Sequence, residues 1–217
     1  MSEPSVSRQH TVTPGDCTAS IADSAGLPWQ TVWELAENKP LKELRKNPFT
    51  LLTGDVVTVP PPQLRHKDCA TDKKHKFVVK TAPIHIRLRV LDENDKPFAN
   101  QPFKLQIDGV NFSGQTDGNG RLEQEISPSA KEGWLLVGGQ EKWREYYLKL
   151  GHVPPIDTTQ GAQARLYDLG YYDGETNGEW NGQTRSALMI FQMKYKLPVT
   201  GSYDQTTQDK LKEVFGS

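Results

Sequence analysis

Residues able to catalyse a reaction are scattered along this sequence rather than grouped. None of the five histidines belongs to an HExxH or HxH pattern, which would present zinc ligands from one face. These histidines are His10, His66, His75, His85 and His152. The paired carboxylates Glu123 and Glu125 are expected on the solvent side of a strand, where they would be hydrated. We therefore expect no catalytic site, no metal site and no cofactor, and predict that the protein is not an enzyme.

A group of residues near the C-terminus could bind a ligand without catalysis. Tyr171, Tyr172, Trp180 and Arg185 surround a loop between two helical patterns. Aromatic faces stack on sugar rings, and a guanidinium group can pair with carboxylates. The group therefore predicts a binding site for sugars and carboxylates. An equally good interpretation is that Tyr171 and Trp180 complete a core that otherwise lacks bulk.

Length and composition limit the classes of protein to consider. The chain has 217 residues, enough for one large domain or two to three small ones. Its formal net charge is -1, so no excess of positive charge favours a nucleic acid or an anionic membrane. The sequence contains no apolar run of about 18 residues, the length that a membrane helix needs. We expect no nucleic-acid partner and no membrane insertion.

Three segments with different periodicity must position the candidate residues. Residues 10–60 predict a strand, two helices and a strand, with Asp16 as the cap of the first helix and a further helical turn at Leu41 and Leu44. Residues 61–76 begin with three prolines and continue as a basic, polar linker.

The next segment, 77–150, alternates apolar and polar residues with a period of two. This pattern predicts a small antiparallel β-sandwich, and Asp117-Gly118-Asn119-Gly120 predicts a hairpin. Residues 155–217 return to helical spacing and predict a three-helix bundle. The predicted helix caps are Thr158 or Thr159, Asn181 and Asp204. The expected fold class is multidomain α+β.

The first segment resembles the LysM module. HTVTPGD and NPFTLLTGDVVTVP carry that family's opening strand and Pro-Gly-Asp turn and its Asn-Pro…Gly-Asp-x-Val-x-Val-Pro close. KPLKELRK lengthens the usual connector, and Cys17 stands where the family commonly has Thr. The resemblance implies a groove for N-acetyl sugars between two loops, although Asp16 could be only a cap and Leu51 only core. The implied contact residues are Gly15, Asp16, Cys17, Thr18, Asn47, Pro48, Phe49, Thr50 and Leu51.

The last segment resembles the three-helix peptidoglycan-binding domain. The resemblance rests on GYYDGETNGEWNGQTRSALMIFQ and LPVTGSYD, which follow that family's Gly-Tyr, Asp-Gly, Thr-Arg-x-Ala-Leu-x-x-Phe-Gln and Leu-x-Val-Thr-Gly patterns. Asn177 and Asn181 depart from the usual Asp and Gly. The resemblance implies that peptidoglycan, as sugar or stem peptide, is the ligand of the aromatic and arginine group.

The middle segment resembles the transthyretin-like or Ig-like β-domains that serve as spacers, through VLDENDKPFANQPFKLQI and SGQTDGNGRLE. The whole order resembles proteins that accompany type VI secretion and related phage-tail-like injection systems. It implies a non-catalytic protein that engages the cell wall through two linked modules. The alternative is a structural adaptor that docks a secretion spike, a tail component or an effector protein.

Two further expectations concern location and the cysteines. The first residues lack the basic and apolar regions of a Sec signal. We therefore expect either a cytoplasmic protein delivered to the periplasm or cell wall by another route, or a signal removed from the sequence. Cys17 and Cys69 could form a disulfide across the linker, or remain free thiols.

Overall fold

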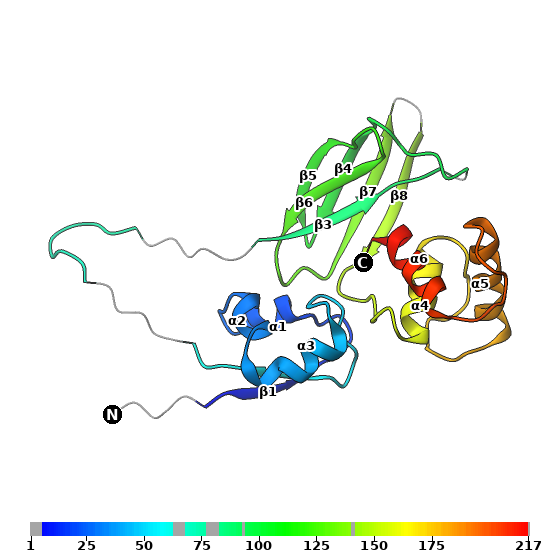
Figure 1. Cartoon of the computed structure of the whole chain (residues 1–217). Helices are drawn as coiled ribbons and strands as arrows, with labels where there is room; N and C mark the ends of the chain where they lie inside the picture. The colour runs from blue at the N-terminus through cyan, green and yellow to red at the C-terminus, as the bar shows by residue number, and fades with distance from the viewer. Residues whose placement is uncertain (1–5, 63–67, 77–82, 93, 140–141, 217) are drawn as a thin grey trace. The chain divides into compact units, whose positions relative to one another are not determined.

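The computed structural model describes residues 6–62, 68–76, 83–92, 94–139 and 142–216 (Figure 1). The chain divides into two compact units, with the main boundary after Gly151. Helices and antiparallel strands are both present, which confirms the predicted mixed α+β class. Within the described residues, no helix is long and apolar enough to cross a membrane. The parts of the chain are described separately below.

The first part contains the predicted order of strand, helices and strand. Strands β1 and β2 pair antiparallel, with His10 opposite Val57. The KPLKELR stretch forms a helix of its own, α3, where one further helical turn was predicted. The elements are β1 (Arg8–Thr11), α1 (Thr18–Ser24), α2 (Trp29–Trp33), the 3-10 turn η1 (Ala36–Asn38), α3 (Lys39–Arg45) and β2 (Val56–Val59).

The prediction that Asp16 caps α1 is wrong, because the N-cap residue is Cys17. The Asp16 carboxylate turns back instead and accepts hydrogen bonds from the backbone N–H and hydroxyl of Thr13, at 2.9 and 2.8 Å. His10 Nε2 lies 3.0 Å from the same oxygen. Ser20 takes over at the helix start by accepting a 3.0 Å hydrogen bond from the Cys17 N–H. Asp16 therefore fixes the turn that precedes the helix.

Two polar residues attach the helices of this part to β2. Asn38 is buried, and its amide donates to Val32 O and Thr58 O while its oxygen accepts from the Thr58 N–H at 2.8 Å. Arg45 forms two parallel hydrogen bonds of 2.8 Å with the Asp55 carboxylate, and both side chains are only 9% exposed. The additional helix α3 is thus joined to the turn that leads into the last strand.

The middle part consists of two antiparallel sheets around one core. The larger sheet has the order β5-β4-β7-β8, and the smaller sheet pairs β3 with β6. The core takes Phe103, Leu105 and Val137 from the larger sheet and Ile86 and Leu122 from the smaller one. The strands are β3 (Ile84–Arg89), β4 (Pro102–Ile107), β5 (Val110–Gln115), β6 (Arg121–Ile126), β7 (Glu132–Gly139) and β8 (Lys142–Lys149).

The prediction of a hairpin at Asp117–Gly120 is wrong, because the strands on either side of this turn do not pair. The Asp117 carboxylate accepts from the N–H groups of Asn119 and Arg121, so a turn does form. However, this turn joins β5 to β6, and these strands belong to different sheets. The tight hairpin of this region is instead the connection of β4 to β5 at Asp108 and Gly109, where φ is 44° and 82°. Positive φ at both positions is what a type I′ turn needs.

The last part is built from α4 (Thr159–Asp168), α5 (Gly182–Lys194) and α6 (Gln205–Phe215). The side chains of Thr158, Asn181 and Asp204 cap these helices, as predicted, by accepting from the N–H three residues further on. Helix α4 contacts both of the others (Figure 1). The core between them is small and apolar, formed by Ala162, Leu166, Tyr172, Ala187, Leu188, Phe191 and Leu211.

Candidate functional site

The tyrosines of the predicted C-terminal site belong mainly to the core of the helical part. Tyr172 is only 5% exposed, and its hydroxyl donates to Glu175 O at 3.0 Å. Tyr171 is half-buried and packs its edge against Phe191 and Tyr195, with ring centroids 5.7 and 6.5 Å apart. Both rings hold the loop after α4 in place, so the interpretation of Tyr171 as core is the better one.

The other two residues of that site lie on the surface. Trp180 is 48% exposed and Arg185 is also exposed, so the interpretation of Trp180 as core is wrong. Trp180 immediately precedes the cap residue of α5, and Arg185 is the fourth residue of that helix. Both residues therefore lie at the N-terminal end of α5. The Arg185 side chain also packs against Gly201. A methyl group added to Gly201 would lie only 2.7 Å from Arg185 Cγ.

Two buried glutamines, which the sequence did not single out, hold the loops beside this surface. Gln163 accepts from the Gly178 N–H at 2.8 Å and donates to Glu179 O at 2.9 Å. Gln192 accepts from the N–H groups of Thr200 and Gly201 at 3.0 and 2.9 Å. Each glutamine is 0% exposed. Because Glu179 adjoins Trp180, Gln163 fixes the backbone from which the exposed indole projects.

A buried arginine was also missed. Arg165 is 1% exposed, and its Nη1 donates to Pro154 O at 2.8 Å and to Gly161 O at 3.0 Å. Its guanidinium lies 5.4 Å from the centre of the Phe215 ring. Burial lowers the pKa of this guanidinium, since the charged form loses hydration. In the sequence, its burial was indicated only by its position next to Leu166 and three residues after Ala162, on the apolar side of α4.

The two loops predicted to bind sugars in the first part are joined directly. The Thr18 N–H donates to Pro48 O at 2.9 Å, and Asn47 Oδ1 accepts from the Phe49 N–H at 2.9 Å. Gly15 has a φ of 88°, a conformation that its lack of a side chain allows. Most of the remaining predicted residues are buried, namely Cys17, Thr18, Thr50 and Leu51.

An apolar rim remains accessible at these loops. Phe49 is 40% exposed, and its ring meets the half-buried ring of Trp29 edge-on at 5.2 Å. The sequence predicted Phe49 as a contact residue, whereas Trp29 was not among the predicted contacts. Two adjoining aromatic rings at a surface form a suitable contact for the apolar face of a sugar.

Charge at the first loop is concentrated on Asp16. Partial burial acts to raise the pKa of its carboxyl, but hydrogen bonds from His10 and Thr13 outweigh this effect and leave the pKa below its ordinary value of 3.8. Asp16 is therefore an anion at neutral pH with its hydrogen-bonding capacity largely used inside the turn. It can shape the loop more readily than it can bind a ligand.

Both cysteines are free thiols in the structure. Cys17 is buried at the start of α1, whereas Cys69 is exposed in the segment 68–76. Of the two alternatives for this pair, the structure therefore contains the free thiols and not the disulfide.

One comparison with known proteins concerns the helical part. Residues 157–211 match the family model described as a putative peptidoglycan binding domain. Over 58 residues the chain is 40% identical to N-acetylmuramoyl-L-alanine amidase CwlM of Mycobacterium tuberculosis, a stretch that covers 27% of this chain and 14% of the amidase. No solved structure gave a significant match. The family match includes α4, α5 and most of α6, and it supports the predicted peptidoglycan-binding helical domain at the C-terminal end.

Proposed function

We propose that this protein binds peptidoglycan without cleaving it. The observation that carries the proposal is the family match, which coincides with the helical part from Asp157 to Leu211. The matched family is described by binding, and the named relative shares only 14% of its length with this chain, so its amidase activity stays a property of that protein. The scattered histidines and carboxylates of the sequence agree with a binding role.

Trp180 and Arg185 form the proposed contact surface of the helical part. The indole of Trp180 offers an exposed aromatic face to a sugar ring. The guanidinium of Arg185 can pair with a carboxylate of the stem peptide through two parallel hydrogen bonds. Tyr171 and Tyr172 pack in and against the core of the helical part, so we assign them a structural role rather than a contact with the ligand.

The first part supplies the second proposed contact, in agreement with its resemblance to LysM modules. The accessible aromatic rim of Phe49 and Trp29 is the surface best suited to a sugar there. Two weak contacts on one chain reinforce each other, because the second forms at a high effective concentration, which strengthens binding by about 10²- to 10⁴-fold. Moderate affinity at each part is therefore enough for firm attachment to a polymer.

A second function is favoured by one observation. The hydrogen bond from Thr18 to Pro48 closes the two predicted sugar loops against each other. Such closed loops fit a docking surface for a protein, for example a spike, tail component or effector of a contractile injection system. Association with such a system, and delivery to the periplasm by a route other than Sec, remain proposals that rest on the resemblance of the three segments.

Co-sedimentation with purified bacterial sacculi tests the main proposal. We expect the full chain to pellet with the sacculi, and a variant lacking residues 155–217 to pellet much less. A variant lacking residues 1–62 should lose part of the binding if the first part also contacts the wall. If the full chain stays in the supernatant, wall binding is not its role, and the adaptor function takes its place.

A further inference from the structure

The larger sheet of the middle part has one buried face and one open face. Phe103, Leu105, Leu135 and Val137 point into the core shared with the smaller sheet. The alternating residues of β4, β7 and β8 point the other way, and these include aromatic side chains. Trp134 is 42% exposed, while Trp143 and Tyr147 are each 44% exposed. Large aromatic residues at this exposure on one sheet face are unusual unless the face has a ligand or partner.

Strand pairing groups these aromatic rings. Trp134 lies directly opposite Tyr147, with ring centroids 4.8 Å apart. Trp143 precedes Tyr147 by four positions on β8, which corresponds to about 14 Å along the strand. The rings therefore extend over a length that accommodates more than one pyranose ring. The hydroxyl of Tyr147 donates to the Glu132 carboxylate, which fixes the orientation of the phenol.

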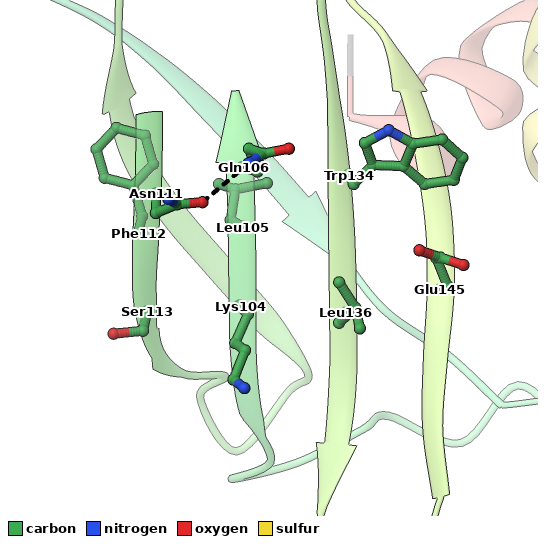
Figure 2. Close-up of a pocket in the computed structure, with 9 residues that line it drawn as sticks. All are labelled: Lys104, Leu105, Gln106, Asn111, Phe112, Ser113, Trp134, Leu136 and Glu145. Carbon is green, nitrogen blue, oxygen red and sulfur yellow. Dashed lines mark hydrogen bonds between the residues drawn. The ribbon is translucent and has the colours of Figure 1, made fainter. Parts of the chain in front are cut away.

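Hydrogen-bonding side chains lie beside the rings on the same face. Gln106 is opposite Trp134 and donates to Asn111 Oδ1 at 3.2 Å, so an amide pair continues the row of aromatic rings (Figure 2). Lys104 is opposite Leu136, and its ammonium lies 5.4 Å from the centre of the Trp143 ring. A shallow pocket across the sheet is lined by residues that include Lys104, Gln106, Asn111, Trp134, Leu136 and Glu145 (Figure 2).

The charged side chains of this face balance, with two lysines and two glutamates. Lys104 and Lys149 project from it together with Glu132 and Glu145. A nucleic acid would require an excess of cations, and an apolar protein surface would leave the amides and charges without partners. An uncharged polymer with apolar ring faces and many hydroxyl groups satisfies both the aromatic rings and the amides.

We propose that the open face of the larger sheet binds the glycan strand of peptidoglycan. Sugar rings stack on Trp134, Trp143 and Tyr147, and Gln106, Asn111 and Lys104 exchange hydrogen bonds with hydroxyl and N-acetyl groups. The middle part is then a binding domain in its own right, where the sequence predicted a spacer. The choice of polymer rests on the proposed function, whereas the sheet face itself does not depend on the helical part.

The test measures the affinity of the full chain for immobilised N-acetylglucosamine oligomers, which share the ring faces, hydroxyl and N-acetyl groups of the glycan strand and carry no charge. The double variant Trp134→Ala/Trp143→Ala should bind about tenfold more weakly, because each aromatic contact contributes roughly two- to tenfold. Val110→Ala is the matched control, since Val110 is 56% exposed on the same sheet but does not share the open face, and this variant should bind as the unchanged chain does.

Two additional double variants control for loss of folding and for binding by the helical part. If the double tryptophan variant does not fold, as judged by circular dichroism, Gln106→Ala/Asn111→Ala keeps every ring and should still weaken glycan binding several-fold. Trp180→Ala/Arg185→Ala, measured on intact sacculi, reports on the helical part separately. Unchanged glycan binding by the sheet variants overturns this inference even if the Trp180 variant loses wall binding. A loss of self-association with unchanged glycan binding also overturns it and assigns the face to a second copy of the chain.

Discussion

The side-chain amide of Gln163 donates a 2.9 Å hydrogen bond to the hydroxyl of Thr184, and both residues are wholly buried. The same arrangement recurs one helix later, where Gln192 donates to Thr207 at 3.0 Å. In each case the threonine is the third residue of the following helix, and its hydroxyl also donates to the cap residue. A repeated glutamine–threonine contact therefore ties each helix to the start of the next.

We predict that Gln163→Ala strongly destabilises the helical part. The change removes the partner of the part-buried Gly178 N–H and Glu179 O and of the buried Thr184 hydroxyl, and a buried group left unsatisfied costs about 1–3 kcal/mol. Gln183→Ala, at an exposed position of α5, should change the free energy of unfolding by less than about 0.5 kcal/mol. Urea unfolding followed by the NMR signals of the helical residues compares the two variants. Equal stability of the two would contradict the role assigned to Gln163.

A glycine in α4 has no room for a side chain. A methyl group on Gly161 would lie 1.9 Å from Pro155 O, and backbone atoms cannot yield as a flexible side chain would. Gly161→Ala should therefore displace the segment before α4 and cost several kcal/mol, on the scale of about 3 kcal/mol for overpacking. Gly182→Ala at the start of α5 meets nothing within 4 Å and should be neutral or slightly stabilising. Thermal unfolding of both variants checks the pair, and a stable Gly161→Ala protein would refute the contact.

In the first part, a buried ion pair should contribute more to the free energy of unfolding than an exposed one. Arg45→Ala leaves the Asp55 carboxylate, which is 9% exposed, without its bidentate partner, and such a loss costs about 3 kcal/mol or more. Lys39→Ala removes a pair with Glu43 that is 4.0 Å long and about three-quarters exposed, worth less than about 1 kcal/mol. Hydrogen exchange at the amides of β2 measures both effects. Equal protection of the β2 amides in the two variants would contradict the role assigned to Arg45.

The turn around Asp16 should depend on pH. Because the pKa of Asp16 is depressed in the folded state, its contribution to stability is present above the ordinary value of 3.8 and is lost as pH falls through the folded value. His10→Ala removes one of the hydrogen bonds responsible, so the pKa of Asp16 should rise towards 3.8. A carbon-13 NMR titration of the carboxyl groups measures this directly.

Asp204 provides the internal control for that titration. The backbone N–H of Thr207 and then its hydroxyl lower the pKa of Asp204, and neither involves His10. Its titration should therefore be the same in both proteins. An unchanged pKa of Asp16 in His10→Ala would show that the Thr13 contacts alone hold the turn.

Local signals in the sequence predicted the elements well. Asn181 and Asp204 were predictable as caps because each directly precedes a helical pattern, whereas the sequence left the first cap open between Thr158 and Thr159 and the structure contains Thr158. Asp16 was assigned wrongly because Cys17 follows it, and the two side chains compete for one helix start. Its carboxylate found a stronger set of donors in His10 and Thr13.

Contacts between residues far apart in the chain could not be predicted from the sequence. A helical glutamine usually faces water, so nothing marked Gln163 as buried, and Gln192 entered only as the last residue of the Phe-Gln pattern. The same limit applies to Asp117–Gly120, where the residues specify a turn but not the partners of the flanking strands. Trp134 and Tyr147 alternate with core residues along their strands, yet only the placement of the smaller sheet decides which face stays open.

The measurement that tests the central claim most directly is the dissociation constant of the full chain for purified sacculi, compared with Trp180→Ala/Arg185→Ala. The control is Tyr167→Ala, which removes an aromatic residue that is 55% exposed elsewhere in the same helical part. We expect the double variant to bind about tenfold more weakly, because exposed Trp and Arg residues are the usual anchors of an interface. The control should bind like the unchanged chain. Equal affinities for all three proteins would contradict wall binding through this surface.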